Sequence, residues 1–228
     1  MAAMALPPIV TFDCYGTLID WESGIASAFS QLPGFERGTP TREAILHAYA
    51  AIEPEVQRHS YRTYRDVLTD AGLRVAKQLG LEVPESSRSF LADSLPAWRP
   101  FPDTNAALES LRARGYSLGI LSNIDDDLLA ATRRQFTVPF DLIVTAQQVR
   151  SYKPSPAHFL TARKAIGDAG WTHAAQSNFH DIVPTNLLGI RNAWINRKGE
   201  RASPGGTPSD EFRDLEGFAE FMGDHPSS

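Results

Sequence analysis

The sequence predicts an α/β protein with a Rossmann-like, parallel-sheet core and a helical segment inserted after the first strand. A β-branched, apolar run at residues 9–12 ends abruptly in Asp13, which is typical of a strand buried on both faces of a parallel sheet. Residues 20–97 then show helical periodicity and no strand signal. From residue 102 onward, apolar runs alternate with helical patterns, which implies right-handed crossovers between parallel strands.

The inserted segment contains three helical patterns. Thr41 is a suitable N-cap for the first of them, which Pro54 disturbs or ends. The other two patterns cover residues 61–79 and 86–95. Pro96 and the Pro-rich residues 100–102 mark the return to the core. We therefore assign residues 1–19 and 98–228 to the core and residues 20–97 to the helical domain.

The remaining core elements follow in regular alternation. Strands are predicted at residues 118–121, at 140–144, near His173 and at 192–195. Helices are predicted at 102–115, from Asp125 toward Phe136, at 155–167, after Asp181 and at 214–222, with a Pro- and Gly-rich loop at 202–209. The three acids at 125–127 look like a metal cluster, but carboxylates also favour helix N-termini through the macrodipole. We prefer the structural interpretation.

Composition and charge exclude several function classes. The 228 residues, 42% of them apolar and 21% charged, are typical of a soluble globular enzyme. A net charge of −5 gives no basic surface for nucleic acid, and no apolar run is long enough to cross a bilayer. Residues 1–7 lack the features of a signal peptide. The single cysteine, Cys14, fits a reducing compartment and a small packing role, so we expect a cytoplasmic protein.

Polar and charged residues follow the predicted strands in order. Asp13 ends the first strand, where open α/β sheets bind ligands. Ser122-Asn123, Lys153 and Asp181 each come after a later strand-like run. This four-motif layout resembles that of the haloacid dehalogenase superfamily, and residues 13–18 resemble the 2-haloacid dehalogenase branch. The resemblance implies that the inserted helices form a small helical cap.

The motif residues allow nucleophilic chemistry. An aspartate can form a covalent ester or acyl phosphate, so Asp13 would attack an electrophilic centre and water would cleave the intermediate. An anionic substrate about 4 Å away would repel it by about 4 kcal/mol at an effective dielectric near 20, and Lys153 suits the role of a fixed cation. Ser122 and Asn123 could donate hydrogen bonds to substrate oxygens or cap a helix. Thr17 could hold a carboxylate oxygen or only a local turn.

Tyr15 decides between two reactions. Phosphatases of the superfamily place a second aspartate two residues after the nucleophile, where it protonates the departing alcohol. Tyrosine, with an ordinary pKa near 10, is poorly matched to that proton transfer. A halide leaving group needs no proton, so Tyr15 favours carbon–halogen hydrolysis over phosphate-ester hydrolysis.

Asp181 would orient or deprotonate the hydrolytic water, with Ser177 and Asn178 shaping its surroundings. The resemblance implies the following sites: catalytic Asp13, Thr17, Lys153, Asn178 and Asp181, and substrate-binding Tyr15, Ser122, Asn123 and Ser177. The dehalogenase branch uses no metal or other cofactor, whereas a magnesium-dependent relative would bind Mg²⁺ through Asp13 and Asp181. His180 is tempting as a base, but we prefer a packing or hydrogen-bonding role.

The sequence departs from the branch at several positions. The family's early cap arginine, which receives the halide, has only Arg42 in the comparable stretch. Three later arginines could either substitute for it or simply be solvated: Arg58, Arg62 and Arg65. Phe159 replaces a family tyrosine, and Gln176 replaces a family serine. Three cap aromatics either line the pocket or pack the core: Trp21, Tyr61 and Tyr64.

The sequence therefore supports three hypotheses. The first is hydrolysis of a short 2-haloacid through an Asp13 ester, with inversion at carbon. The second is magnesium-dependent phosphoryl or phosphonyl hydrolysis, for which Lys77 is the cap lysine available to an imine mechanism. The third is a non-catalytic protein that binds a small acid or a protein partner. The expected ligand is a small anionic organic acid, and a homodimer is compatible with the sequence.

Overall fold

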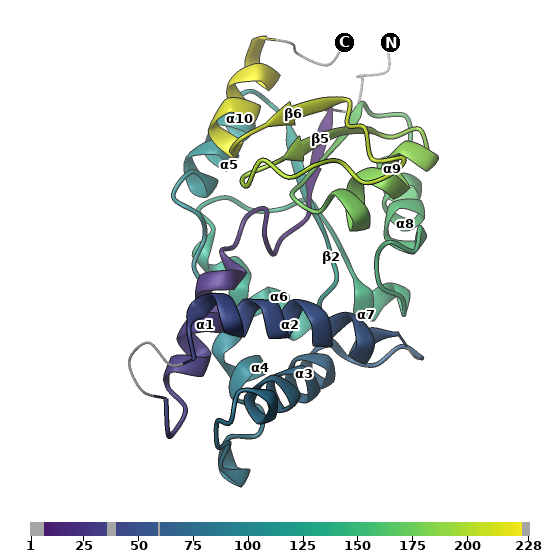
Figure 1. Ribbon diagram of the computed structural model, residues 1–228. Helices are drawn as coiled ribbons and strands as arrows, with labels where there is room; N and C mark the ends of the chain where they lie inside the picture. The colour runs from purple at the N-terminus through teal and green to yellow at the C-terminus, as the bar shows by residue number, and fades with distance from the viewer. Residues whose placement is uncertain (1–6, 36–39, 59, 225–228) are drawn as a thin grey trace, which may run out of the picture. The chain divides into compact units, whose positions relative to one another are not determined.

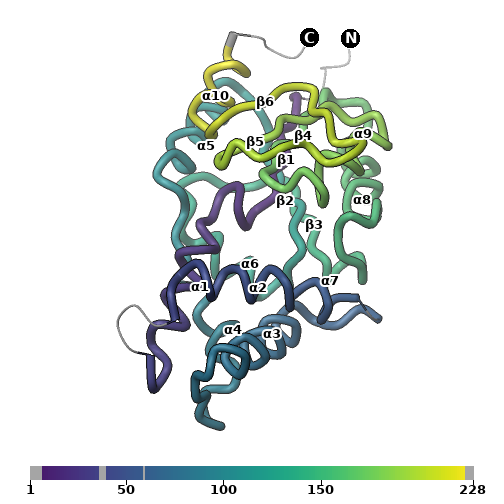
Figure 2. The backbone as a smooth tube through the Cα atoms, viewed as in Figure 1, coloured from purple at the N-terminus to yellow at the C-terminus, as the bar shows by residue number. Residues whose placement is uncertain are grey.

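The computed structural model describes residues 7–35, 40–58 and 60–224. Six strands form one parallel sheet in the order β3-β2-β1-β4-β5-β6 (Figures 1 and 2). They are β1 (Ile9–Phe12), β2 (Ser117–Ser122), β3 (Leu142–Thr145), β4 (Trp171–Ala175), β5 (Arg191–Ile195) and β6 (Asp210–Phe212). This sheet confirms the predicted α/β fold with a parallel-sheet core.

Strand β1 lies between β2 and β4 and is buried throughout. Its last residue, Phe12, pairs with Ile120 of β2 on one side and with Ala174 of β4 on the other. The backbone N–H of Asp13 continues this ladder and donates to the carbonyl of Ala174 at 3.1 Å. Asp13 therefore leaves the sheet at the carboxyl end of a central strand, where parallel sheets place their ligands.

One compact unit of the chain contains the sheet and is called the core unit; it comprises residues 1–19, 100–123 and 134–228. In Figure 1, α5 (Thr104–Ala113) and α10 (Leu215–Asp224) lie on one side of the sheet, and α8 (Ala157–Ile166) and α9 (Val183–Leu187) lie on the other. Three short helical segments complete the unit: η3 (Arg133–Gln135) at its border, α7 (Ala146–Val149) and the π-helical turn η4 (Asn178–Ile182). Because helices cover both faces, most positions of the central strands are apolar.

The second compact unit, called the helical unit, comprises residues 20–99 and 124–133. Its elements are α1 (Trp21–Ser30), α2 (Arg42–Gln57), α3 (Tyr64–Gln78), η1 (Glu85–Ser87), α4 (Phe90–Ser94), η2 (Leu95–Ala97) and α6 (Asp126–Thr132). Thr41 caps α2 as predicted, because its hydroxyl accepts a hydrogen bond from the Ala44 N–H at 3.2 Å. Pro54 lies inside α2, which continues to Gln57 before it ends.

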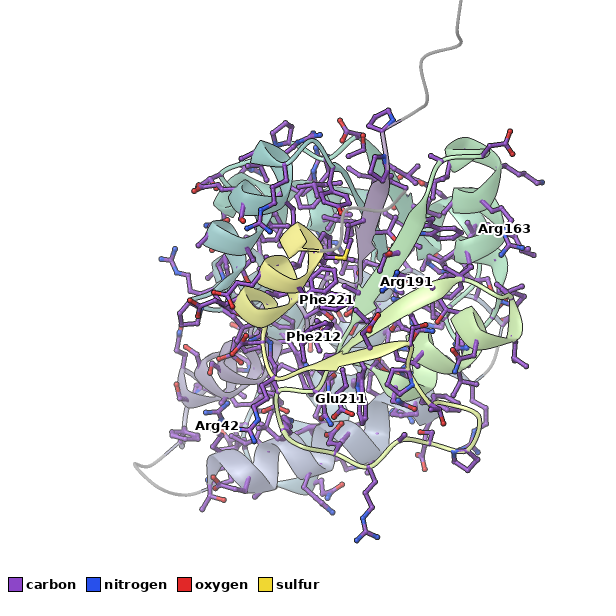
Figure 3. All side chains as sticks on the ribbon, turned by 90° about the horizontal axis from the view of Figure 1, so that it is seen from above. Arg42, Arg163, Arg191, Glu211, Phe212 and Phe221 are labelled. Carbon is purple, nitrogen blue, oxygen red and sulfur yellow. The ribbon has the colours of Figure 1, made fainter. Side chains whose placement is uncertain are left out.

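The edge strand β6 was not predicted from the sequence. It is only three residues long and pairs with β5 alone. Figure 3 shows Phe212 of β6 beside Phe221 of α10, with ring centroids 5.3 Å apart, and Phe212 also contacts Phe218 at 5.5 Å. One apolar residue therefore anchors the strand, too little for a recognisable alternation.

No helix in the described ranges is both long enough and apolar enough to span a membrane.

Candidate active site

Four of the residues predicted for the site converge at the carboxyl ends of β1 and β4. Lys153 Nζ donates to Asp13 Oδ1 at 2.9 Å and to Asp181 Oδ1 at 2.6 Å. Thr17 Oγ1 donates to the other Asp13 oxygen, Oδ2, at 3.0 Å. All four residues are buried. The result is a carboxylate–ammonium–carboxylate cluster in which each Asp13 oxygen has one protein donor.

Lys153 is held by its backbone as well as by its charge. Its Nζ donates a third hydrogen bond, to the carbonyl of Leu121 at 2.9 Å. The side-chain amide of Asn123 accepts from the Lys153 N–H at 2.7 Å and donates to the Lys153 carbonyl at 3.1 Å. The three ammonium protons thus all have acceptors, as a buried lysine requires. Asn123, predicted to bind substrate, uses its side chain to position this lysine.

The charges of the cluster follow from burial and from Lys153. Burial raises the pKa of Asp13 above its ordinary value, although Lys153 and two hydrogen bonds oppose the shift. Burial also opposes ionisation of Asp181, but Lys153 and His173 outweigh it and lower the pKa of Asp181 to about 2. Burial works against the charge of Lys153, yet the two carboxylates raise its pKa. Asp13 is therefore the more basic, and so the more nucleophilic, of the two carboxylates.

Thr17 connects the Asp13 loop to two other loops of the core unit. Its hydroxyl, which donates to Asp13, accepts from the backbone N–H of Gln176 at 2.9 Å. Its carbonyl accepts from Arg197 Nη2 at 2.9 Å, and the Arg197 guanidinium lies over the ring of Phe101 at 3.9 Å. Sequence reasoning missed Arg197. It lies two residues after the predicted strand at 192–195, and the pattern of polar residues after strands could have included it.

Asp181 has two unequal oxygens. Oδ1 accepts from Lys153 Nζ and from His173 Nε2, the latter at 2.9 Å. Oδ2 is buried and has no hydrogen-bond partner among the described residues. A buried carboxylate oxygen without a donor is costly, so a ligand or water is expected there. His173 was predicted only as part of a strand, and no local pattern indicated this contact.

The other predicted binding residues divide into two groups. The Ser122 hydroxyl is buried and unpartnered in the described structure, which leaves a donor available for a substrate oxygen. Ser177 instead accepts from the His180 N–H at 3.2 Å and pairs with His180 Nδ1 at 2.9 Å. Tyr15 is half-buried and forms an isolated bridge with Ile19. The substrate-binding roles predicted for these residues stay predictions.

Asn178 bonds to a neighbouring loop. Its amide nitrogen donates to the Gly206 carbonyl at 2.8 Å, and its amide oxygen accepts from the Ser203 N–H at 2.9 Å. Both ends of the side chain are thereby engaged with residues 203–206. A Cβ built on Gly206 would overlap the Asn178 amide, so the close approach requires glycine at this position.

The acidic run 125–127 has a structural explanation within the helical unit. The Asp125 carboxylate accepts from the N–H groups of Tyr64 and Arg65, both at 2.9 Å, at the start of α3. Asp127 pairs with the Arg65 guanidinium at 2.7 Å. In the described ranges, no group of three His, Cys, Asp or Glu side chains is placed to hold a metal ion. Under the magnesium hypothesis, the ligands would be Asp13 and the unpartnered Oδ2 of Asp181.

The arginines considered for halide binding are mostly paired within the helical unit. Arg42 lies 3.8 Å from Glu22, and Arg62 lies 3.1 Å from Asp70. Arg65 pairs with Asp127 and, at 3.4 Å, with Asp93. Arg58 follows the last residue of α2. The arginine side chains in these pairs are exposed, so each pair is weak and the pairing does not exclude these arginines as halide ligands.

A buried carboxylate–lysine cluster lies at the carboxyl end of a parallel sheet, the place where α/β enzymes hold their catalytic groups. The chain belongs to the haloacid dehalogenase-like hydrolases, because the model of that family matches residues 8–173. This result confirms the superfamily predicted from the four motifs.

Within this family, the chain resembles several dehalogenases. The chain is 29% identical over 219 residues to the (S)-2-haloacid dehalogenase of Pseudomonas sp. (strain YL), covering 93% of each chain. It is 27% identical over 196 residues to haloacetate dehalogenase H-2 of Moraxella sp. (strain B), covering 83% of this chain and 86% of that one. The crystal structure of the L-2-haloacid dehalogenase RSc1362 superposes with a TM-score of 0.81 at 26% identity, covering 95% and 98%. The protein is a dehalogenase-like hydrolase.

Proposed function

We propose that this enzyme hydrolyses the carbon–halogen bond of a short (S)-2-haloalkanoic acid to give the 2-hydroxy acid. The observation that carries the proposal is the Asp13 carboxylate, buried between Lys153 and Thr17, with Tyr15 in place of a second acid two residues later. A halide leaves without a proton, so the site needs a nucleophile and a cation but no general acid beside the nucleophile.

In the first step, one Asp13 oxygen attacks C2 of the substrate from the side opposite the halogen. The carbon–halogen bond breaks with its electron pair on the halide, and an ester forms between Asp13 and C2. Lys153 offsets the repulsion between Asp13 and the substrate carboxylate, about 4 kcal/mol at a separation near 4 Å. The buried Ser122 hydroxyl is the donor we assign to the substrate carboxylate.

In the second step, water attacks the carbonyl carbon of the Asp13 ester. The oxygen Oδ2 of Asp181, buried and unpartnered among the described residues, would orient this water. The bond between the Asp13 carbonyl carbon and the oxygen on C2 then breaks; one proton of the water goes to that departing oxygen and the other passes to solvent, so Asp13 returns as a carboxylate. With a pKa of about 2, Asp181 keeps neither proton. Because this step does not touch C2, the configuration inverted in the first step is retained in the product.

The test combines substrate range with an isotope label. We expect halide release from (S)-2-chloropropionate in the presence of EDTA and no release by Asp13→Asn. A single turnover in ¹⁸O-water should place the label in the Asp13 carboxylate and leave the hydroxy acid unlabelled. Asp168→Asn, an exposed carboxylate of the core unit, is the matched control and should keep full activity.

Three results would contradict the proposal. Direct labelling of the hydroxy acid in the first turnover would exclude an ester intermediate. Turnover of a phosphate ester that requires Mg²⁺, without halide release from any haloacid, would favour magnesium-dependent hydrolysis. Absence of turnover of both haloacids and phosphate esters would favour a protein that only binds small acids.

A further inference from the structure

A chain of three hydrogen bonds links Trp171 to Asp181 through Thr11 and His173. Trp171 Nε1 donates to Thr11 Oγ1 at 2.8 Å. Thr11 Oγ1 lies 2.8 Å from His173 Nδ1, and His173 Nε2 lies 2.9 Å from Asp181 Oδ1. Thr11 and His173 are register partners on the adjacent strands β1 and β4, and both are fully buried.

The donor of each hydrogen bond in this chain can be assigned, starting from Trp171. An indole N–H only donates, so Thr11 accepts from Trp171. The single hydroxyl proton of Thr11 has one remaining partner in the described structure, His173 Nδ1. A hydroxyl that donates to Nδ1 leaves the ring proton on Nε2. The imidazole N–H is then directed at Asp181.

The consequence for Asp181 is that one oxygen is saturated and the other is left for water. Oδ1 has two donors, Lys153 and His173, whereas the buried Oδ2 has none among the described residues. The edge-to-face contact of Phe159, with centroids 5.2 Å from the imidazole and planes at 87°, fixes the plane of the ring. Two donors from different directions prevent the carboxylate from exchanging its oxygens.

We propose that His173 is a positioning residue for ester hydrolysis: held by Thr11 and Trp171, it fixes Asp181 so that Oδ2 alone faces the hydrolytic water. This inference rests on the proposed function, since it requires an Asp13 ester. Ester formation should not depend on His173, because the oxygens of Asp13 are held by Lys153 and Thr17. Ester hydrolysis should depend on it.

The test is the fate of the ester in variants of His173. In His173→Leu the donor is lost, and we expect ester hydrolysis to slow by about 10- to 100-fold, the effect of losing a hydrogen bond to a charged group. The Asp13 adduct should then accumulate in acid-quenched samples, seen by intact mass and peptide mapping, while KM changes little. His173→Gln, whose amide N–H can replace Nε2–H, should restore hydrolysis in part.

A second buried histidine provides the control. His158 is equally buried and contacts the carbonyl of Ser122 at 3.2 Å. His158→Leu removes a histidine of the same size from the same core, and we expect it to destabilise the protein without accumulation of the adduct. If His173→Leu and His158→Leu lose activity alike, with no adduct in either, His173 is only structural and the inference is wrong.

Thr11→Val keeps the test decisive if His173→Leu does not fold. Valine cannot donate to Nδ1, so the imidazole loses the hydrogen bond that holds it from the Thr11 side, and the ¹⁵N chemical shift of Nδ1 should report this loss. We expect the adduct to accumulate here too, to a smaller extent. Unchanged ester hydrolysis despite loss of this hydrogen bond would overturn the inference. If wild type and Asp181→Asn never form an adduct, the proposed function itself fails.

Discussion

The substitution Lys153→Met tests whether electrostatics hold the active-site cluster together. Methionine fills most of the volume of the lysine stem but carries no charge, so the variant leaves Asp13 and Asp181 buried without their shared cation. Lys153 Nζ lies 2.9 Å from one carboxylate and 2.6 Å from the other. The two carboxylates are therefore close neighbours that cannot both stay ionised at low cost.

The expected magnitude follows from these distances. Two unit charges about 5 Å apart repel by about 3 kcal/mol at an effective dielectric near 20, and removing one partner of a buried ion pair costs about 3–5 kcal/mol. We expect Lys153→Met to lower the free energy of unfolding by about 4 kcal/mol at alkaline pH.

The loss should depend on pH with a definite sign. In the variant, repulsion raises the folded-state pKa of one carboxylate above the unfolded value of about 3.9. Between these two pKa values the folded state binds more protons than the unfolded state, so stability increases as the pH falls, by up to about 1.4 kcal/mol per pH unit. The deficit relative to wild type should shrink accordingly.

Urea unfolding at about pH 5 and about pH 8 measures this dependence. Lys77→Met, at an exposed position on α3, is the matched control and should change stability by no more than about 0.5 kcal/mol. The double variant Lys153→Met, Asp181→Asn removes one of the repelling charges and should recover much of the lost stability. A loss that is independent of pH and unchanged in the double variant would refute the electrostatic explanation in favour of packing.

Three further predictions concern the surroundings of the site. Gly206→Ala should lower the free energy of unfolding, measured in urea, by about 1–3 kcal/mol, because the new methyl group overlaps the Asn178 amide. An unchanged urea midpoint would show that the loop shifts to accommodate the methyl group. Arg197→Lys should lower the free energy of unfolding by about 1–2 kcal/mol, since a lysine cannot both stack on the ring of Phe101 and replace the planar guanidinium that pairs with Asp103. An unchanged free energy of unfolding would contradict this. Because the pKa of Asp181 falls from 3.8 to about 2 on folding, it contributes roughly 2 kcal/mol above about pH 4, lost as the pH falls toward 2. The acid limb of wild-type stability should be steeper there than that of Asp181→Asn, and identical slopes would contradict the assignment.

Much of the core could be predicted from the sequence because its signals are local. Strands of a doubly covered parallel sheet are apolar at most positions, so residues 9–12 and 118–121 were recognisable without tertiary information. The polar residues that follow these strands, Asp13 and Ser122 among them, could be placed at one edge of the sheet. The three-residue strand β6 escaped prediction because Phe212 is its single apolar anchor.

The sequence was sufficient to predict the parallel α/β core and the grouping of Asp13, Lys153 and Asp181, since parallel strands bring their carboxyl ends to one edge. Only the tertiary structure decided where each side chain points. In the folded chain, Asn178 bonds to residues 203–206 and Asn123 bonds to the backbone of Lys153. His173, which the sequence predicts only as a strand residue, contacts Asp181. The physical reason is that such contacts join residues far apart in the chain. Their partners follow from strand register and side-chain direction, which no local pattern encodes.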